Sequence, residues 1–232
     1  MNHEPPFLPR SDRIVAIHAG RVRSVAASGG REWWDKEWET GFFKEPVAGE
    51  VFVGLEAIEG DAQADRVNHG GPDKAVCVYA AAHYPDWRQS LNLPEMPFGA
   101  FGENFTVEGL VEDEVCIGDV FEAEGVVFQI SQPRQPCWKL SRRWKVKDLS
   151  ARVVANGRTG WYFRVLQTGR VSAGTMLRLR ERPHPNWTVT AANGVMHLRQ
   201  GGDEAAAGLA ACAALSGSWR ESLERRAASV EE

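Results

Sequence analysis

Between residues 13 and 180 the sequence is a succession of short runs that are rich in β-branched and aromatic residues and are broken by glycine. Runs of this length and composition are typical of β-strands. The expected strands span 13–18, 51–58, 74–80, 104–107, 119–123, 126–130, 160–166 and 175–180. So many short strands in series predict a β-barrel or a strongly folded sheet.

Three helices are expected among these strands, at 81–91, 137–144 and 149–156, the last of them ended by Gly157 as a C-cap. After the stiff Pro-His-Pro linker at 183–185 the pattern changes to helix-like segments at 188–199, 203–215 and 218–228. Ser218 and Glu221 suit the capping box of the last helix.

The sequence therefore predicts a mainly β (α+β) fold with two domains. Residues 1–182 form a barrel surrounded by a few helices, and residues 183–232 form a small three-helix domain. Because the motifs described below all precede residue 183, we expect this second domain to be an accessory that lies outside the pocket of the barrel.

Composition restricts the partners of the protein. The net charge of −4 argues against a general nucleic-acid surface, which needs an excess of basic residues. No apolar run approaches the roughly 18 residues that cross a bilayer, and the first residues do not resemble a signal sequence. We expect a cytoplasmic protein that binds neither membranes nor nucleic-acid polymers.

Cys137 stands apart from the other three cysteines. Cys77, Cys116 and Cys212 lie in apolar or alanine-rich runs and are expected in the core, and no pair has the spacing of a zinc site. Cys137 follows two prolines on a basic loop, with no carboxylate between 125 and 147, and a positive field favours the thiolate. The alternative for Cys137 is a small buried apolar side chain.

Five motifs, taken together and in order, carry a family resemblance. They are Asn-His-Gly-Gly-Pro-Asp-Lys-Ala-Val at 68–76, Phe-Gly-Glu-Asn-Phe-Thr at 101–106, Ile-Gly-Asp at 117–119, Gln-Pro-Arg-Gln-Pro-Cys at 132–137 and Gly-Arg-Thr-Gly-Trp-Tyr at 157–162. The chain resembles the MOSC family, which is related to the C-terminal domain of molybdenum cofactor sulfurase. Within that family it is similar to the YiiM-like branch, which adds a C-terminal three-helix domain.

The resemblance implies a MOSC β-barrel with a pocket for the molybdenum cofactor, a pterin dithiolene that carries a phosphate. It implies Cys137 as the ligand to molybdenum, and a thiolate is the soft donor that such a metal needs. His69 is a second catalytic candidate, as a proton source. The candidates for binding the cofactor are Arg66, Lys74, Glu103, Asn104, Arg134 and Arg158.

Structural alternatives stay open for several of these residues. Glu103 and Asn104 are suited to cap a turn before the next strand, His69 to bond its own backbone, and Arg66 to pair with the aspartate before it. The tryptophans of segment 29–49 either pack together or form a lid over a flat heterocycle. These tryptophans are Trp33, Trp34 and Trp38.

The resemblance implies a molybdenum-dependent oxidoreductase that detoxifies N-hydroxylated compounds, such as 6-hydroxylaminopurine-type bases and hydroxylamines, by reducing them to amines. The sequence has neither a dinucleotide-binding glycine fingerprint nor an iron-sulfur cysteine set. A separate reductase or electron carrier is therefore expected. Two other functions stay open: a sulfur transferase with a persulfide on Cys137, and a non-catalytic carrier of the cofactor.

Overall fold

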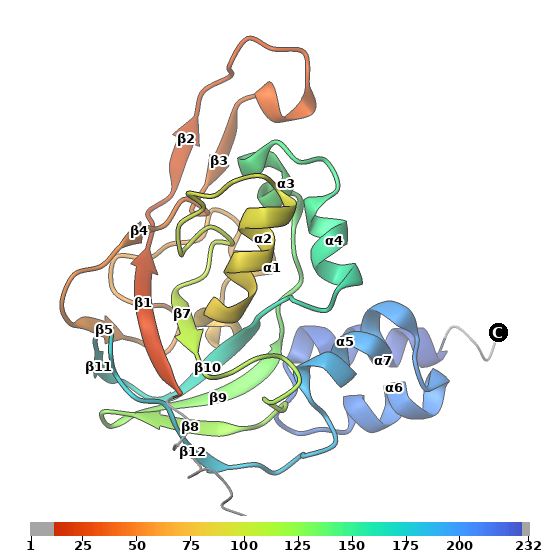
Figure 1. Ribbon diagram of the computed structural model, residues 1–232. Helices are drawn as coiled ribbons and strands as arrows, with labels where there is room; N and C mark the ends of the chain where they lie inside the picture. Colours follow the sequence, from red (N-terminus) through yellow and green to blue (C-terminus); the bar gives the residue numbers. More distant parts are fainter. Residues whose placement is uncertain (1–11, 229–232) are drawn as a thin grey trace, which may run out of the picture.

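The computed structural model describes residues 12–228 and is built around one curved eight-stranded sheet (Figure 1). The strand order is β12-β8-β9-β10-β6-β7-β1-β4, and the neighbours are antiparallel except for the parallel pair β6–β7. The bounds are β1 (Arg13–Ala19), β4 (Glu45–Pro46), β6 (Val76–Ala80), β7 (Phe105–Glu108), β8 (Val120–Ala123), β9 (Val126–Pro133), β10 (Trp161–Gln167) and β12 (Arg178–Glu181).

The sheet curls back on itself, so that its interior is an apolar core. The backbone N–H of Ile14 donates to the carbonyl of Thr175 at 3.0 Å, and that of Gly174 donates to the carbonyl of Ile14 at 2.7 Å. These bonds join β1 to the segment that precedes β12. Two small sheets complete the strands, β5 (Val51–Val53) with β11 (Gly169–Val171) and β2 (Arg23–Val25) with β3 (Trp38–Thr40). The predicted barrel-like, mainly β architecture is confirmed.

Helices cover the outside of the barrel beside β6. Val76 and Val78 pack into the barrel, whereas Tyr79 packs into a second apolar cluster with residues of α2, α3 and α4. The rings of Tyr79 and Phe101 are stacked there, 4.3 Å apart. The helices are α1 (Arg66–His69), α2 (Tyr84–Ser90), α3 (Trp138–Trp144), α4 (Leu149–Ala155), α5 (Val189–Leu198), α6 (Gly202–Ala210) and α7 (Gly217–Ala228), with 3-10 turns η1 (Trp33–Asp35), η2 (Pro72–Lys74) and η3 (Ala81–His83).

The strand expected over 51–58 and the last two helices are among the elements that differ from the predictions. The strand expected over 51–58 ends at Val53, because Gly54 starts a turn that folds Ile58 back onto Val53. The helix expected over 203–215 ends at Ala210. The last helix starts at Gly217 and is capped by Ser216, whose hydroxyl accepts from the backbone N–H of the third residue after it at 3.3 Å.

The C-terminal helices share the apolar core of the barrel. Val189, Leu209 and Trp219 belong to the same buried cluster as Ile117 and Phe128 of the barrel. Backbone hydrogen bonds also join residues 115–117 to residues 187–189. The division of the chain at 182/183 stays a prediction, and the outer ends of the two predicted domains, 1–11 and 229–232, lie outside the described residues.

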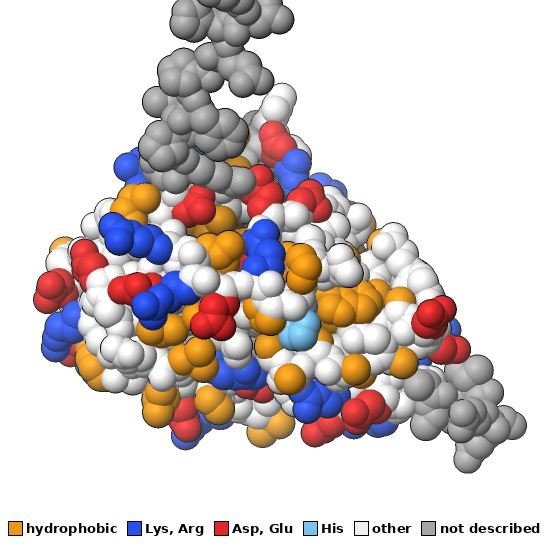
Figure 2. Space-filling model, turned by 90° about the horizontal axis from the view of Figure 1, so that it is seen from below, with side chains coloured by type: hydrophobic (Ala, Val, Ile, Leu, Met, Phe, Trp, Pro, Cys, Tyr) orange, Lys and Arg blue, Asp and Glu red, His pale blue; other side chains and the backbone are white. Residues whose placement is uncertain are grey.

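The surface mixes both signs of charge. On the face seen from below the barrel, basic and acidic side chains are interspersed among apolar and neutral ones, and neither sign forms a continuous patch (Figure 2). On β12 and β8, for example, Arg180 pairs with Glu122 at 3.4 Å. Within residues 12–228 no helix has the length and apolar character to span a membrane.

Replacing Trp219 tests whether the C-terminal helices and the barrel form one folding unit. Trp219 is 1% exposed, so we expect Trp219→Ala to lower the free energy of unfolding by about 3 to 5 kcal/mol. Because the core is continuous, the barrel and the C-terminal helices should unfold in a single urea transition. Circular dichroism and hydrogen exchange monitor this transition. Leu198→Ala, at a site that is 58% exposed, is the control and should change stability by less than about 0.5 kcal/mol. Separate early unfolding of the three helices would contradict a shared core.

Candidate functional site

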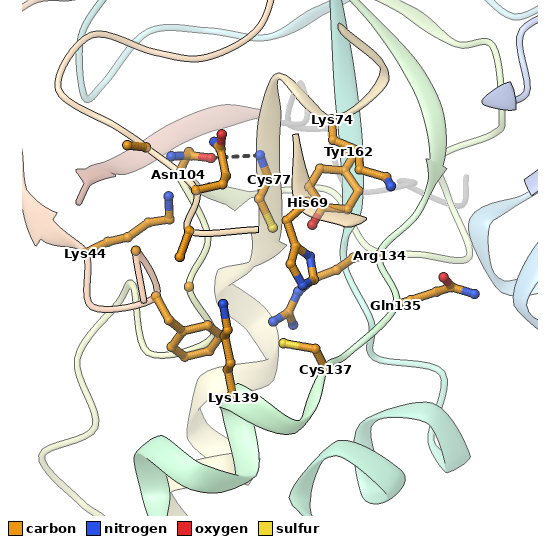
Figure 3. A pocket seen from close by; sticks show the side chains of 16 residues that line it. Lys44, His69, Lys74, Cys77, Asn104, Arg134, Gln135, Cys137, Lys139 and Tyr162 are labelled. Carbon is orange, nitrogen blue, oxygen red and sulfur yellow. Dashed lines mark hydrogen bonds between the residues drawn. The ribbon is translucent and has the colours of Figure 1, made fainter. Parts of the chain in front are cut away.

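Cys137 lines two neighbouring cavities, which we call the inner and the outer chamber. The inner chamber has about 590 Å³ of empty space and the outer about 1070 Å³, each counted out to open solvent. Five residues line both chambers: His69, Lys74, Gln135, Cys137 and Tyr162. The inner chamber is bounded by residues of β6, of the loop between β9 and α3, and of the segments around Lys44 and Asn104 (Figure 3).

The loop that carries Cys137 is fixed on both sides of the thiol. After it, the hydroxyl of Ser150 donates to the carbonyl of Cys137 at 2.7 Å. Before it, the N–H of Arg134 donates to the carbonyl of Gly160 at 3.0 Å. Gly160 has a φ of +71°, and a Cβ there would lie 2.2 Å from the carbonyl oxygen of Val78, so this position requires glycine. The half-buried thiol is thereby held toward the chamber (Figure 3).

Arg134 is a buried charge with one unsatisfied donor. Its Nη2 donates to the carbonyl of Phe101 at 2.6 Å, and the residue is only 4% exposed. Its Nη1 is buried without a hydrogen-bond partner among the described residues. The guanidinium lies between His69 and Cys137 in the chamber wall (Figure 3). An unpaired buried donor of this kind is costly, so an anionic or carbonyl acceptor in the chamber would stabilise it.

The inner chamber is basic. Its lining includes Lys44, Lys74, Arg134 and Lys139, and none of its lining residues is an aspartate or glutamate. Of these cations, Lys44 forms an ion pair with the fully buried carboxylate of Asp61 behind it. The chamber therefore has the electrostatic character of an anion site.

His69 enters this chamber from the end of α1, a four-residue helix whose N-cap is Asp65. Burial, together with the nearby charges of Lys139 and Arg134, lowers the pKa of His69 to about 4. At neutral pH the ring is therefore a neutral imidazole, and its role as a proton source stays a prediction. His69 holds a proton to give only when a bound anion raises its pKa.

Cys77 and Tyr162 are wall residues that the sequence reasoning missed. Cys77 is buried as predicted, but it also lines the inner chamber. Burial raises its pKa to about 11, and burial also raises the pKa of Tyr162, so both keep their protons at neutral pH. The alternation of side chains along β6 could have indicated this, because it places Cys77 on the same face as Tyr79 and opposite the residues that pack into the barrel.

Asn104 lines the inner chamber while serving the scaffold. Its Oδ1 accepts from the N–H of Cys77 at 3.0 Å, and its Nδ2 donates to the carbonyl of His18 at 3.2 Å. Lys74 lines both chambers, and its Nζ donates to the carbonyl of Asn68 at 2.7 Å. These two predicted cofactor residues therefore do reach the cavity.

Glu103 does not reach the cavity. It is fully buried and accepts hydrogen bonds from the side chains of Tyr84 and Thr106 and from the N–H groups of Gly99 and Phe101. The structural alternative applies, because the carboxylate shapes the loop whose carbonyl holds the buried arginine. Its predicted contact with the cofactor is corrected accordingly.

Two predicted arginines form ion pairs with other residues and line neither chamber. The exposed side chain of Arg66 pairs with Glu56 at 3.0 Å, and Arg158 pairs with Asp86 at 2.8 Å. Neither lines a chamber. Each of these ion pairs has at least one strongly exposed partner, so it contributes little to stability and leaves the arginine outside the site.

The tryptophans of segment 29–49 pack together instead of covering the cavity. Trp33 and Trp38 contact Trp138, with ring centroids 6.3 Å and 5.6 Å apart, and the guanidinium of Arg142 lies 4.8 Å from the ring of Trp38. None of the three tryptophans of this segment lines a chamber. The packing alternative therefore describes them better than the lid.

The outer chamber is walled in part by α7. Its lining from that helix is Ser218, Glu221, Ser222 and Arg225. No residue of the three-helix region lines the inner chamber, so its expected place outside the cofactor pocket stays a prediction, but α7 does line the outer chamber. The family motifs could not indicate this role of α7, because the wall is formed by polar residues spaced along one face of the helix and not by a compact motif.

Comparison with known proteins extends over nearly the whole chain. A family model for the MOSC domain matches residues 65–178, and a model for the YiiM-like, 3-alpha helix domain matches residues 187–229. The chain is 45% identical to the uncharacterized protein YflK of Bacillus subtilis, over 92% of this chain and 93% of that protein. It is 35% identical over 82% of its length to a protein of Gibberella moniliformis named "Reductase", of which it spans 33%. The crystal structure of YiiM from Geobacillus stearothermophilus matches with a TM-score of 0.77 and 34% identity, covering 93% of this chain and 99% of the other.

The protonation of His69 gives a direct test of the basic chamber. We expect its ring to become half protonated only at about pH 4. An NMR titration measures this, and the signal of His69 is identified as the one that is missing from the spectrum of His69→Gln. An unfolded histidine has a pKa of about 6.5. The unfolded chain therefore takes up a proton first as the pH falls, and wild type should lose more stability than His69→Gln between about pH 6.5 and 4. Added inorganic phosphate should raise the pKa of His69. Titration near 6.5 without phosphate would contradict the arrangement.

Proposed function

The chain belongs to the MOSC domain family, in its YiiM-like branch, and on that premise we propose that it is a molybdenum-cofactor-dependent reductase of N-hydroxylated compounds that acts in the cytoplasm. The named reductase among its relatives supports an oxidoreductase role. One observation supports the proposal most: the half-buried thiol of Cys137 lies beside a buried guanidinium with an unused donor, in a chamber without carboxylates.

The residues present fit the molybdenum cofactor. When bound, the cofactor would supply two-electron redox chemistry at molybdenum. The sulfur of Cys137 would be the soft protein ligand for that metal. Arg134, Lys74 and Lys139 would hold the phosphate or polar edges of the pterin through charge-assisted hydrogen bonds.

The overall reaction is balanced by two electrons and two protons: R–NH–OH becomes R–NH2 and water as the N–O bond breaks and nitrogen is reduced. A separate reductase or electron carrier would supply the electrons. Around Cys137 the chain offers the protonated side chains of Tyr162 and Cys77 and the neutral ring of His69. These groups can donate hydrogen bonds to the leaving oxygen and relay protons to that oxygen. The fixed loop of Cys137 determines where the N–OH group of the substrate must bind.

Removing the thiol tests the ligand role. Cys137→Ala should abolish reduction of N-hydroxylated substrates with a chemical electron donor, while the barrel stays folded and part of the pterin remains bound. Cys116→Ala is the matched control, because Cys116 is 2% exposed and lines neither chamber. This substitution should lower the free energy of unfolding by about 1 kcal/mol and leave the reductase activity unchanged. Full activity of Cys137→Ala would exclude the ligand role. Sulfane sulfur on Cys137 without molybdenum would instead favour a sulfur transferase.

Two arginines from the family motifs should behave oppositely. Arg134→Ala removes a charge-assisted bond to the cofactor worth about 1.5 to 3 kcal/mol, and should weaken cofactor binding about ten- to a hundredfold. Arg158→Ala removes an ion pair outside both chambers and should leave cofactor content unchanged. Pterin released from equal amounts of each purified protein measures the difference. Equal cofactor loss in both variants would show that the anion site is misplaced.

A further inference from the structure

The outer chamber differs from the inner one in charge. Among its lining residues Asp65 and Glu221 offset Lys74 and Arg225. Glu221 and Arg225 also lie 3.9 Å apart as a weak pair along α7. Apart from the ring of His69 and the sulfur of Cys137, the rest of the lining consists of amide, hydroxyl and apolar side chains. This chamber therefore suits a neutral polar molecule, whereas the inner chamber suits an anion.

One face of α7 forms the wall. Ser218, Glu221, Ser222 and Arg225 are spaced at i, i+3, i+4 and i+7, which places them in one stripe along the helix. We call these four residues the α7 wall. On the opposite side of the helix, Trp219 and Leu223 are each 1% exposed in the apolar core.

The α7 wall is fixed relative to Cys137. At the start of the helix, the N–H of Gly217 donates to Oδ2 of Asp73 at 3.1 Å, and Asp73 also accepts from Arg164 at 2.6 Å and 2.8 Å. The hydroxyl of Ser218 donates to the side-chain oxygen of Gln132 at 3.3 Å. The helix is thus attached both to the 3-10 turn η2, which contains Asp73 and Lys74, and to β9, the strand that leads to Cys137.

The lining of the outer chamber also includes exposed apolar side chains. Trp138, the residue after Cys137, is 49% exposed, and Val67 of α1 is 90% exposed. An exposed indole beside hydroxyl and amide groups offers a flat apolar contact together with hydrogen-bonding partners. Trp138 also receives Arg142 on its ring at 5.5 Å, which helps to hold its orientation.

We propose that the α7 wall selects the substrate: it contacts the non-reacting part of a neutral, polar N-hydroxylated molecule whose N–OH group points to Cys137. The inference rests on the proposed function and deepens it. It assigns substrate choice to the three-helix region and cofactor binding to the inner chamber. Small hydroxylamines reach Cys137 without touching the wall, whereas larger substrates are held by it.

The test narrows the outer chamber without touching the inner one. Ser222→Phe adds a ring to the α7 wall, and Glu224→Phe adds the same ring to an exposed position of the same helix that lines neither chamber. Cofactor-loaded protein with a chemical electron donor is assayed on N-methylhydroxylamine and on 6-hydroxylaminopurine. Pterin content is measured in parallel.

We expect Ser222→Phe to lower kcat/KM for 6-hydroxylaminopurine about tenfold more than for N-methylhydroxylamine, chiefly through KM, with unchanged pterin content. Glu224→Phe should leave the ratio of the two kcat/KM values as in wild type. If Ser222→Phe leaves the ratio of the two kcat/KM values unchanged, the α7 wall does not select the substrate. If Ser222→Phe loses pterin, α7 contacts the cofactor instead, and the proposal is also wrong. If wild type reduces neither compound, it is the proposed function that fails.

Discussion

A single buried charge organises this site. The guanidinium of Arg134 is held by the carbonyl of Phe101 and lines the inner chamber, and its other terminal nitrogen is buried without a partner among the described residues. Glu103 shapes the loop that presents this carbonyl, and Gly160 fixes the loop that carries Arg134 and then Cys137. Motifs far apart in the sequence thus serve one purpose, because a charged group can be kept buried only where its surroundings are rigid and its partners are in place.

The sequence predicted the barrel well and the directions of side chains poorly. Runs of β-branched residues become buried strands wherever they are uninterrupted, so β1, β6, β8, β9 and β10 lie close to where they were expected. Local hydrogen bonding decided the exceptions, as where Gly54 turns the chain. Motif membership identified Arg134 and Arg158 alike, yet only tertiary packing determines that the first is buried and the second pairs with Asp86. Likewise, a sequence gives no sign that Glu103 faces four donors inside the fold.

The C-terminal helices change the account of the cavity. They share the core of the barrel, and α7 completes the outer chamber. Cys137 therefore stands between a basic chamber and a charge-balanced one. This division matches the needs of a reaction in which an anionic cofactor stays bound while neutral substrates come and go, since each compartment is complementary to one of them.

The central claim is that the inner chamber holds the molybdenum cofactor, with Cys137 as ligand to the metal. Metal and pterin analysis of protein purified from a host that makes the cofactor tests it most directly, combined with X-ray absorption spectroscopy at the molybdenum edge. The account predicts molybdenum and pterin in equal amounts, and a metal–sulfur ligand that is lost in Cys137→Ala. Protein that carries neither molybdenum nor pterin when the host supplies both, or an unchanged sulfur shell in the variant, would contradict it.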